Sequence, residues 1–230
     1  MVPDLSPDEW QALSLSLRVA AASVAVSLPF ALALAWWLSR SRRRGRTLVQ
    51  ALLVLPLTLP PVVTGYALLV MFGRNGVVGE WLASFGLYLA FRWTGAVLAA
   101  AVMGFPLLVL SIRVAFDGVD RRLERAAETL GAGAWRRFLT IVVPLSSGGI
   151  IAGCILAFAR AFGEFGATIS FVGSIPGETR TLPIAIFELM NTPDGETGLR
   201  RLAIVAVLVS LAATLIAAWL GGALWSRRDD

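Results

Sequence analysis

The chain has 230 residues, of which 57% are hydrophobic and 15% are charged, and its mean hydropathy is +0.76. This composition is far more apolar than that of a soluble domain, so it excludes an ordinary water-soluble globular protein. The net charge is +5, all 20 basic residues are arginine, and there is no histidine and only one cysteine, Cys154. We therefore expect no internal disulfide, no metal site of histidine or clustered cysteine, and no catalytic residue of the Ser-His type.

Four long apolar windows contain no charged residue, and a fifth is interrupted by Arg160 and Glu164. A hydrocarbon core about 30 Å thick is crossed by roughly 20 apolar residues of helix, so each window is long enough to span a membrane. Helices satisfy their backbone polar groups internally, and the short alternating segments typical of a barrel are not seen. The prediction is an all-α, polytopic membrane helical bundle that forms a single domain over residues 1–230. Its five expected spans are 13–38, 47–72, 93–114, 138–170 and 202–226.

The arginines are unevenly distributed among the loops between these spans. Cytoplasmic loops accumulate basic residues, so the distribution predicts a periplasmic N-terminus, five crossings and a cytoplasmic C-terminus, with six crossings as the alternative. A topology signal that also contacts anionic lipid is enough to explain the run at 40–46. The arginines assigned to the cytoplasmic side are Arg40, Arg42, Arg43, Arg44, Arg46, Arg121, Arg122, Arg125, Arg136, Arg137, Arg227 and Arg228, and those in the alternate loops are Arg74, Arg92, Arg180, Arg200 and Arg201.

Three further segments bear on the topology. Residues 77–91 are amphipathic and rich in aromatic side chains, and residues 181–189 are apolar but too short to cross a bilayer. We expect both to form short helices or re-entrant pieces at the outer interface. Residues 1–11 are acidic rather than basic, so the first apolar run is expected to be a retained span and not a signal peptide.

The longest polar interruption is residues 118–143, which the arginine distribution places in the cytoplasm. The sequence predicts a helix, a turn and a second helix, because Asp120 can cap the first helix and Gly131 can end it. Small residues, among them Ala126 and Ala127, leave a shallow surface into which another protein can press. A solvated pair of juxtamembrane helices is the alternative.

This loop resembles the EAA loop of ABC-importer permeases, which has two alanines, a glycine four residues after the second, and a hydrophobic-x-hydrophobic-Pro ending. In that family the loop docks as a coupling helix in a cleft of the cytoplasmic ATPase subunit. One position departs from the pattern: Arg125 stands where the family has glutamate, and Glu124 precedes it, so the acidic contact is shifted or unused. The coupling residues implied by the resemblance are Glu124, Ala126, Ala127, Gly131, Ala132 and Pro144.

The chain contains no lysine and therefore cannot form the P-loop of an ATPase. We expect ATP and magnesium to be bound by a separate ATPase chain, and no cofactor to be bound by this one.

The polar residues inside the apolar windows are candidates for a translocation pathway, because charged groups at bilayer depth are costly. Arg160 and Glu164 are spaced i, i+4, so one helix face would bring them together, either as a structural ion pair or along the route of a dianion. Three prolines interrupt the second window and would free Thr58 and Thr64 for an oxyanion, unless the threonines bond back to the helix. The pathway residues predicted in this way are Thr58, Pro60, Pro61, Thr64, Arg160, Glu164 and Thr168.

Residues 56–79, 158–168 and 180–196 resemble the molybdate branch of the ABC-importer permeases, within a likeness that extends over about 13–225. The resemblance implies a permease subunit that carries molybdate, with tungstate as a second candidate cargo, across the bacterial inner membrane by alternating access. It also implies a homodimer in the lipid bilayer, two copies of the ATPase and a periplasmic oxyanion-binding protein, with no nucleic acid as partner.

Two alternatives remain open. A sulfate or thiosulfate permease of the same family would be a longer chain with tyrosine in place of Phe165. An ion-coupled secondary anion transporter would show an inverted repeat, which is not evident in the sequence. A membrane enzyme has few reactive groups to use here, since the chain lacks histidine, lysine and clustered cysteine.

Overall fold

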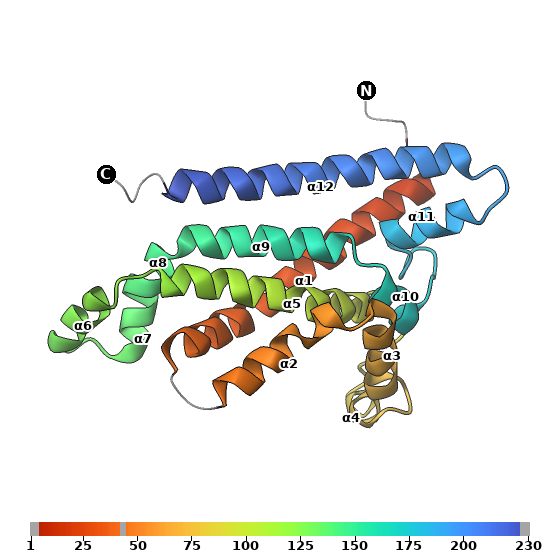
Figure 1. Cartoon of the computed structure of the whole chain (residues 1–230). Coiled ribbons are helices and arrows are strands. Elements are labelled where there is room, and N and C mark those ends of the chain that lie inside the picture. The colour runs from red at the N-terminus through yellow and green to blue at the C-terminus, as the bar shows by residue number, and fades with distance from the viewer. Residues whose placement is uncertain (1–4, 42–44, 226–230) are drawn as a thin grey trace.

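The computed structural model describes residues 5–41 and 45–225, and the side chains within 5–41 and 45–219 (Figure 1). The described residues form helices and turns without a β-strand, which confirms the predicted all-α class. Arg42, Arg43, Arg44, Arg227, Arg228 and the expected end of the fifth span at 226 lie outside the described residues. The helices are α1 Pro7–Arg40, α2 Arg46–Thr58, α3 Pro61–Phe72, α4 Val77–Ala83, α5 Trp93–Asp117, α6 Arg121–Thr129, α7 Ala134–Arg137, the π-helical turn η1 Phe138–Val142, α8 Val143–Leu145, α9 Ser147–Phe162, α10 Gly166–Val172, α11 Leu182–Met190 and α12 Glu196–Trp225.

Helices α1, α5 and α12 are each long and apolar enough to cross a membrane. Helix α1 begins at Pro7, earlier than the predicted residue 13, because a capping box extends it beyond the apolar run. The Ser6 hydroxyl accepts a hydrogen bond from the Glu9 amide (3.3 Å), and the Glu9 carboxylate accepts one from the Ser6 amide (2.8 Å). Hydropathy alone misses such a start, because the capping residues are polar.

The expected second span is broken at its prolines, as the sequence predicts. Helices α2 and α3 meet at 111°, and the break falls at Leu59 and Pro60. Pro60 and Pro61 cannot donate to the preceding turn, so α2 ends and α3 starts in a new direction.

The fourth expected span, 138–170, is divided among several helices. The segment before Ser146 and helix α9 meet at 73°. A second break separates α9 from α10 at Gly163. Pro144 lies just after the π-helical turn and has no amide to donate to the preceding turn, which weakens the helix before the first break. Counting each bent pair as one span gives five candidate spans.

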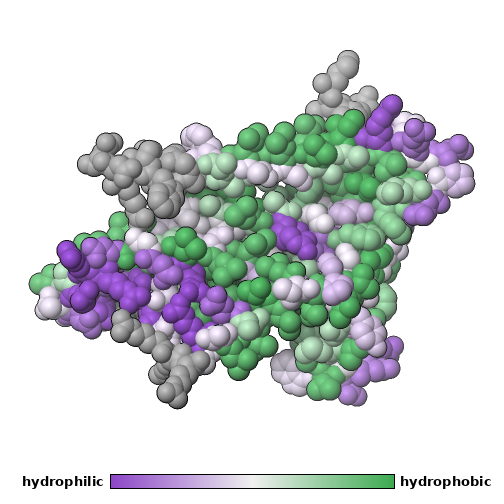
Figure 2. All heavy atoms as spheres, in the orientation of Figure 1, coloured by the Kyte–Doolittle hydropathy of each residue, from purple (hydrophilic) through white to green (hydrophobic). Residues whose placement is uncertain are grey.

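The long helices pack side by side, with α5 at the centre in contact with α1 and α9, and α12 on the outer side of α9 (Figure 1). The apolar window of α5 is 61% buried, whereas that of α12 is 17% buried, so α12 presents most of its apolar side chains outward. Apolar side chains cover much of the middle of the face in Figure 2, and hydrophilic ones gather mainly at its ends. This distribution suits a protein surrounded by lipid at its middle.

The bundle has two distinct ends. The coupling end carries α6, α7 and the end of α1, and the distal end carries α3, α4, α10 and α11 (Figure 1). Of the two short segments, 181–189 forms helix α11 as expected, whereas only the first half of 77–91 is helical, as α4.

Candidate functional site

Arg160 and Glu164 form an ion pair at the break between α9 and α10. Arg160 Nη1 lies 2.5 Å from Glu164 Oε2, and Glu164 Oε1 accepts a hydrogen bond from the Ala167 amide (2.9 Å). The predicted pair therefore exists, but it does not lie on one helix face, because α9 ends at Phe162. The Glu164 side chain is 2% exposed and that of Arg160 is 28% exposed, so the arginine is the group of this pair that an anion can reach.

Helices α3 and α10 cross at very short range next to this break. A Cβ atom placed on Gly65 of α3 would lie 2.5 Å from the carbonyl oxygen of Ala167, and one on Gly166 of α10 would lie 2.7 Å from Pro61 Cβ. Only glycine allows this approach, and it fixes the direction that α3 takes after the proline break.

The other predicted pathway residues fall into two groups. Thr64 of α3 and Thr168 of α10 are buried, and the Thr64 hydroxyl oxygen has no hydrogen-bond partner among the described residues. Thr58, at the end of α2, is exposed and donates its hydroxyl to the Leu55 carbonyl (2.9 Å), which is the back-bonding alternative considered for these threonines. Pro60 is exposed in the break itself.

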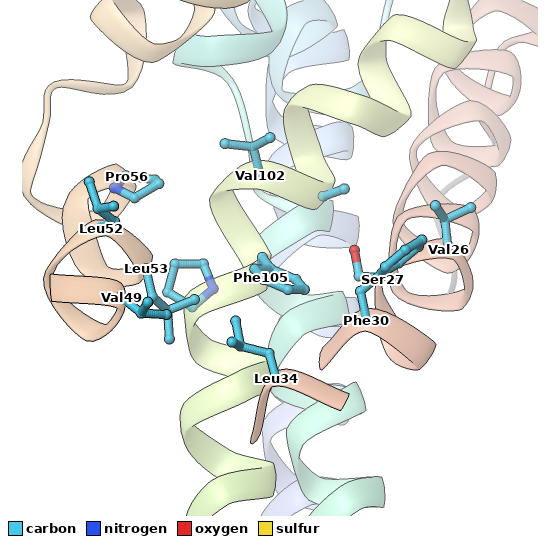
Figure 3. A pocket seen from close by; sticks show the side chains of 12 residues that line it. Val26, Ser27, Phe30, Leu34, Val49, Leu52, Leu53, Pro56, Val102 and Phe105 are labelled. Carbon is cyan, nitrogen blue, oxygen red and sulfur yellow. The ribbon is translucent and has the colours of Figure 1, made fainter. Parts of the chain in front are cut away.

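A large groove lies between α1, α2 and α5, with a volume of about 540 Å³ (Figure 3). Ser27 is the one polar side chain among its twelve lining residues, which otherwise include Val26, Phe30, Leu52 and Phe105. Because an oxyanion needs donors or positive charge, the apolar lining of this groove does not suit an oxyanion.

The coupling loop has the predicted helix-turn-helix form. The Asp120 carboxylate accepts a hydrogen bond from the Arg122 amide (2.8 Å) at the start of α6. Gly131, at φ +84°, reverses the chain after α6, and the Ala132 amide donates to the Ala127 carbonyl (2.9 Å). The left-handed conformation at residue 131 favours glycine, which explains why glycine stands there.

The surface of this loop is open. Leu130 and Trp135 are 88% and 66% exposed, and no atom lies within 4 Å of a Cβ position on Gly131. Ala126 and Pro144 are exposed as well, and Ala127 and Ala132 are half-buried. Exposed large apolar side chains around a glycine turn form a surface suited to a protein partner.

Glu124 does not face this open surface. Its carboxylate pairs with Arg40 at the end of α1, and the two side chains are 15% and 19% exposed. No local pattern in the sequence indicates this contact, because the two residues are separated by 84 positions and Arg40 lies in an arginine run that is typical of a topology signal. A second ion pair, Glu128 with Arg137 at 2.5 Å, connects α6 to α7.

Comparison with known proteins places this architecture in a family. Residues 27–229 match the family described as binding-protein-dependent transport system inner membrane component. The chain is 55% identical over 217 residues to the molybdenum transport system permease protein ModB of Escherichia coli (strain K12), covering 94% of this chain and 95% of that protein. It is 40% identical over 152 residues to the sulfate transport system permease protein CysT of the same strain, covering 66% of this chain and 55% of that protein.

The fold is also found in a solved structure. A bacterial alginate ABC transporter in complex with its alginate pentasaccharide-bound periplasmic protein superposes with a TM-score of 0.68 at 19% identity, over 94% of this chain and 77% of that one. With the match over residues 27–229, this chain belongs to the inner membrane components of binding-protein-dependent transport systems.

Proposed function

We propose that this chain is the membrane-spanning permease of an ATP-driven importer of molybdate. The observation that carries the proposal is the 55% identity to a molybdenum permease along almost the full length of both chains. The sulfate permease is less similar and is matched over a smaller part of its length, so sulfate is the weaker candidate cargo. Tungstate is a tetrahedral dianion like molybdate and is the second candidate.

The energy for transport comes from a partner chain in this proposal. A chain without lysine has no P-loop, so ATP and magnesium bind to a separate ATPase subunit. The exposed turn around Gly131, with Ala126, Ala127 and Ala132, is the surface on which that subunit docks. Two copies of this chain and two of the ATPase form the complex, and the arginine-rich coupling end lies in the cytoplasm.

The anion enters from the periplasm, where a binding protein delivers it to the distal end. Arg160 supplies positive potential to the dianion, and Glu164 keeps that potential low enough for release. The Thr64 hydroxyl is buried and has no hydrogen-bond partner among the described residues, so it becomes a donor to the anion only in a state of the pathway that exposes it. Closure of the ATPase subunits moves the coupling loops and alternates access to the pathway between the two sides. No covalent bond of the anion is made or broken.

Reconstitution in proteoliposomes tests the need for a partner. We expect molybdate uptake only when the chain, the ATPase subunit, the binding protein and ATP are all present. Uptake that persists without the ATPase would contradict the proposal and favour an ion-coupled secondary transporter.

A further inference from the structure

Helix α6 of the coupling loop is held in place by polar contacts. None of its nine residues is buried, so α6 contributes no side chain to the hydrophobic core. Burial of apolar surface is the usual source of helix docking energy. The position of α6 relative to α1 therefore depends on the contacts that its charged side chains make.

Two of these contacts reach the last turn of α1. Two nitrogens of the Arg40 guanidinium contact the Glu124 carboxylate. Nη2 pairs with Oε1, and Nε lies 3.4 Å from Oε2. Arg121 Nη2 donates a hydrogen bond to the carbonyl oxygen of Ser39 (3.0 Å). We call Ser39, Arg40, Asp117, Arg121 and Glu124 the α1–α6 clamp.

The clamp also includes the end of α5. The Ser39 hydroxyl donates to the Asp117 carboxylate and accepts a hydrogen bond from Arg40 Nη1 (2.8 Å). Arg40 Nη1 also lies 3.3 Å from the Phe116 carbonyl oxygen. The guanidinium of Arg40 thus joins three helices, and its rigid fork holds them in one geometry.

Burial makes this clamp stronger than an ordinary surface ion pair. The side chains of Arg40 and Glu124 are 19% and 15% exposed, and Ser39 is buried. An exposed pair contributes little to stability, whereas a partly buried and multiply hydrogen-bonded pair is less screened by solvent and salt.

The loop has two covalent connections to the membrane helices: residues 118–120 join α5 directly to α6, and a longer, bent path leads from α7 to α9. From α7 the chain passes through the π-helical turn Phe138–Val142, then Pro144, and then a 73° bend into α9. Wide turns and proline bends interrupt the regular hydrogen bonds of a helix, so such a joint absorbs displacement.

We propose that the α1–α6 clamp is the linkage through which movement of the coupling loop reaches α1. Arg40 and Glu124 are positioning residues in this role, and Glu124 acts within the chain rather than on the ATPase. The inference rests on the proposed function, since it assigns the route of the motion that an ATPase drives.

A double-mutant cycle in the reconstituted complex tests the linkage. In Arg40→Gln and in Glu124→Gln, we expect anion uptake per ATP hydrolysed to fall about tenfold while the ATPase subunit still copurifies. The double variant should be no worse than either single variant, because one contact is lost in all three. Arg46→Gln is the matched control, since it removes a charge at the same end and Arg46 forms no ion pair with a described residue. Unchanged coupling in the single variants, or additive losses in the double one, would overturn the proposal.

Hydrogen exchange of this chain alone in nanodiscs gives a readout that does not depend on the cargo. We expect the amides of α6 to exchange about tenfold faster in Arg40→Gln and Glu124→Gln, with α9 unchanged. Exchange of α6 at the rate of the unmodified chain would overturn the clamp. A wild-type complex that imports no molybdate would contradict the proposed function instead, and the exchange rates would still decide the clamp.

Discussion

Gly65 of α3 lies directly against Ala167 of α10, at a distance that leaves no room for a side chain on residue 65. A Cβ atom there would come within 2.5 Å of the Ala167 carbonyl oxygen and 2.8 Å of Ser170 Cβ. Helix α3, which carries Thr64, and helix α10, which carries Thr168, are therefore in direct backbone contact. The Arg160–Glu164 pair is connected to α10 by the hydrogen bond from the Ala167 amide to Glu164. The geometry of the candidate pathway depends on this crossing.

Replacing Gly65 with alanine should separate α3 from α10. Because the atom in the way is backbone, one helix must move, and overpacking of this kind costs about 1–3 kcal/mol. We expect a lower thermal unfolding temperature in detergent and reduced uptake. Gly163→Ala is the matched control, since its nearest neighbour would be 3.7 Å away. Equal stability of the two variants would show that the crossing tolerates a side chain.

Arg160→Gln should leave the Glu164 carboxylate buried without its counter-charge. Removing one partner of a buried pair costs about 3–5 kcal/mol, and the exposure of Arg160 places the expected loss at the lower end of this range. Uptake should fall while the ATPase remains bound. Thermal unfolding and uptake are measured on the same preparations.

The double variant Arg160→Gln, Glu164→Gln distinguishes a purely structural ion pair from one whose arginine attracts the anion. It contains no unpaired charge, so stability should return toward that of the unmodified chain. If Arg160 attracts the anion, uptake stays low in spite of the restored stability. Recovery of both quantities would mean that the pair is only structural.

Gly131→Trp should uncouple the chain from its ATPase without affecting membrane insertion. Residue 131 has φ +84°, and tryptophan there would strain the backbone and fill the exposed turn. We expect loss of ATPase copurification and of uptake, with normal yield in the membrane fraction. Gly131→Asn is the control, because asparagine accepts the left-handed conformation with a small side chain. Normal uptake in the tryptophan variant would count against the assignment of this surface.

The features that follow from local chemistry could be predicted from the sequence. Apolar runs located the membrane helices, and Asp120 and Gly131 marked the ends of α6 because capping and a left-handed turn depend on single residues. The break before Pro61 follows from the missing amides of two prolines. Each of these signals lies within a few residues of the structure that it predicts.

The features that depend on distant contacts could not be predicted in this way. Arg40 belongs to an arginine run that is typical of a topology signal, and its partner Glu124 is 84 residues away. The division of 138–170 was missed because hydropathy does not register a bend at Ser146 or a helix end at Gly163. The close approach of Gly65 to α10 is likewise set by packing between separate segments.

The most direct test of the central claim is competitive uptake by the complete reconstituted complex with its own binding protein. With labelled molybdate and ATP, we expect uptake that excess unlabelled molybdate abolishes and that an equal excess of sulfate leaves nearly unchanged. Labelled sulfate taken up in preference to molybdate would contradict the account.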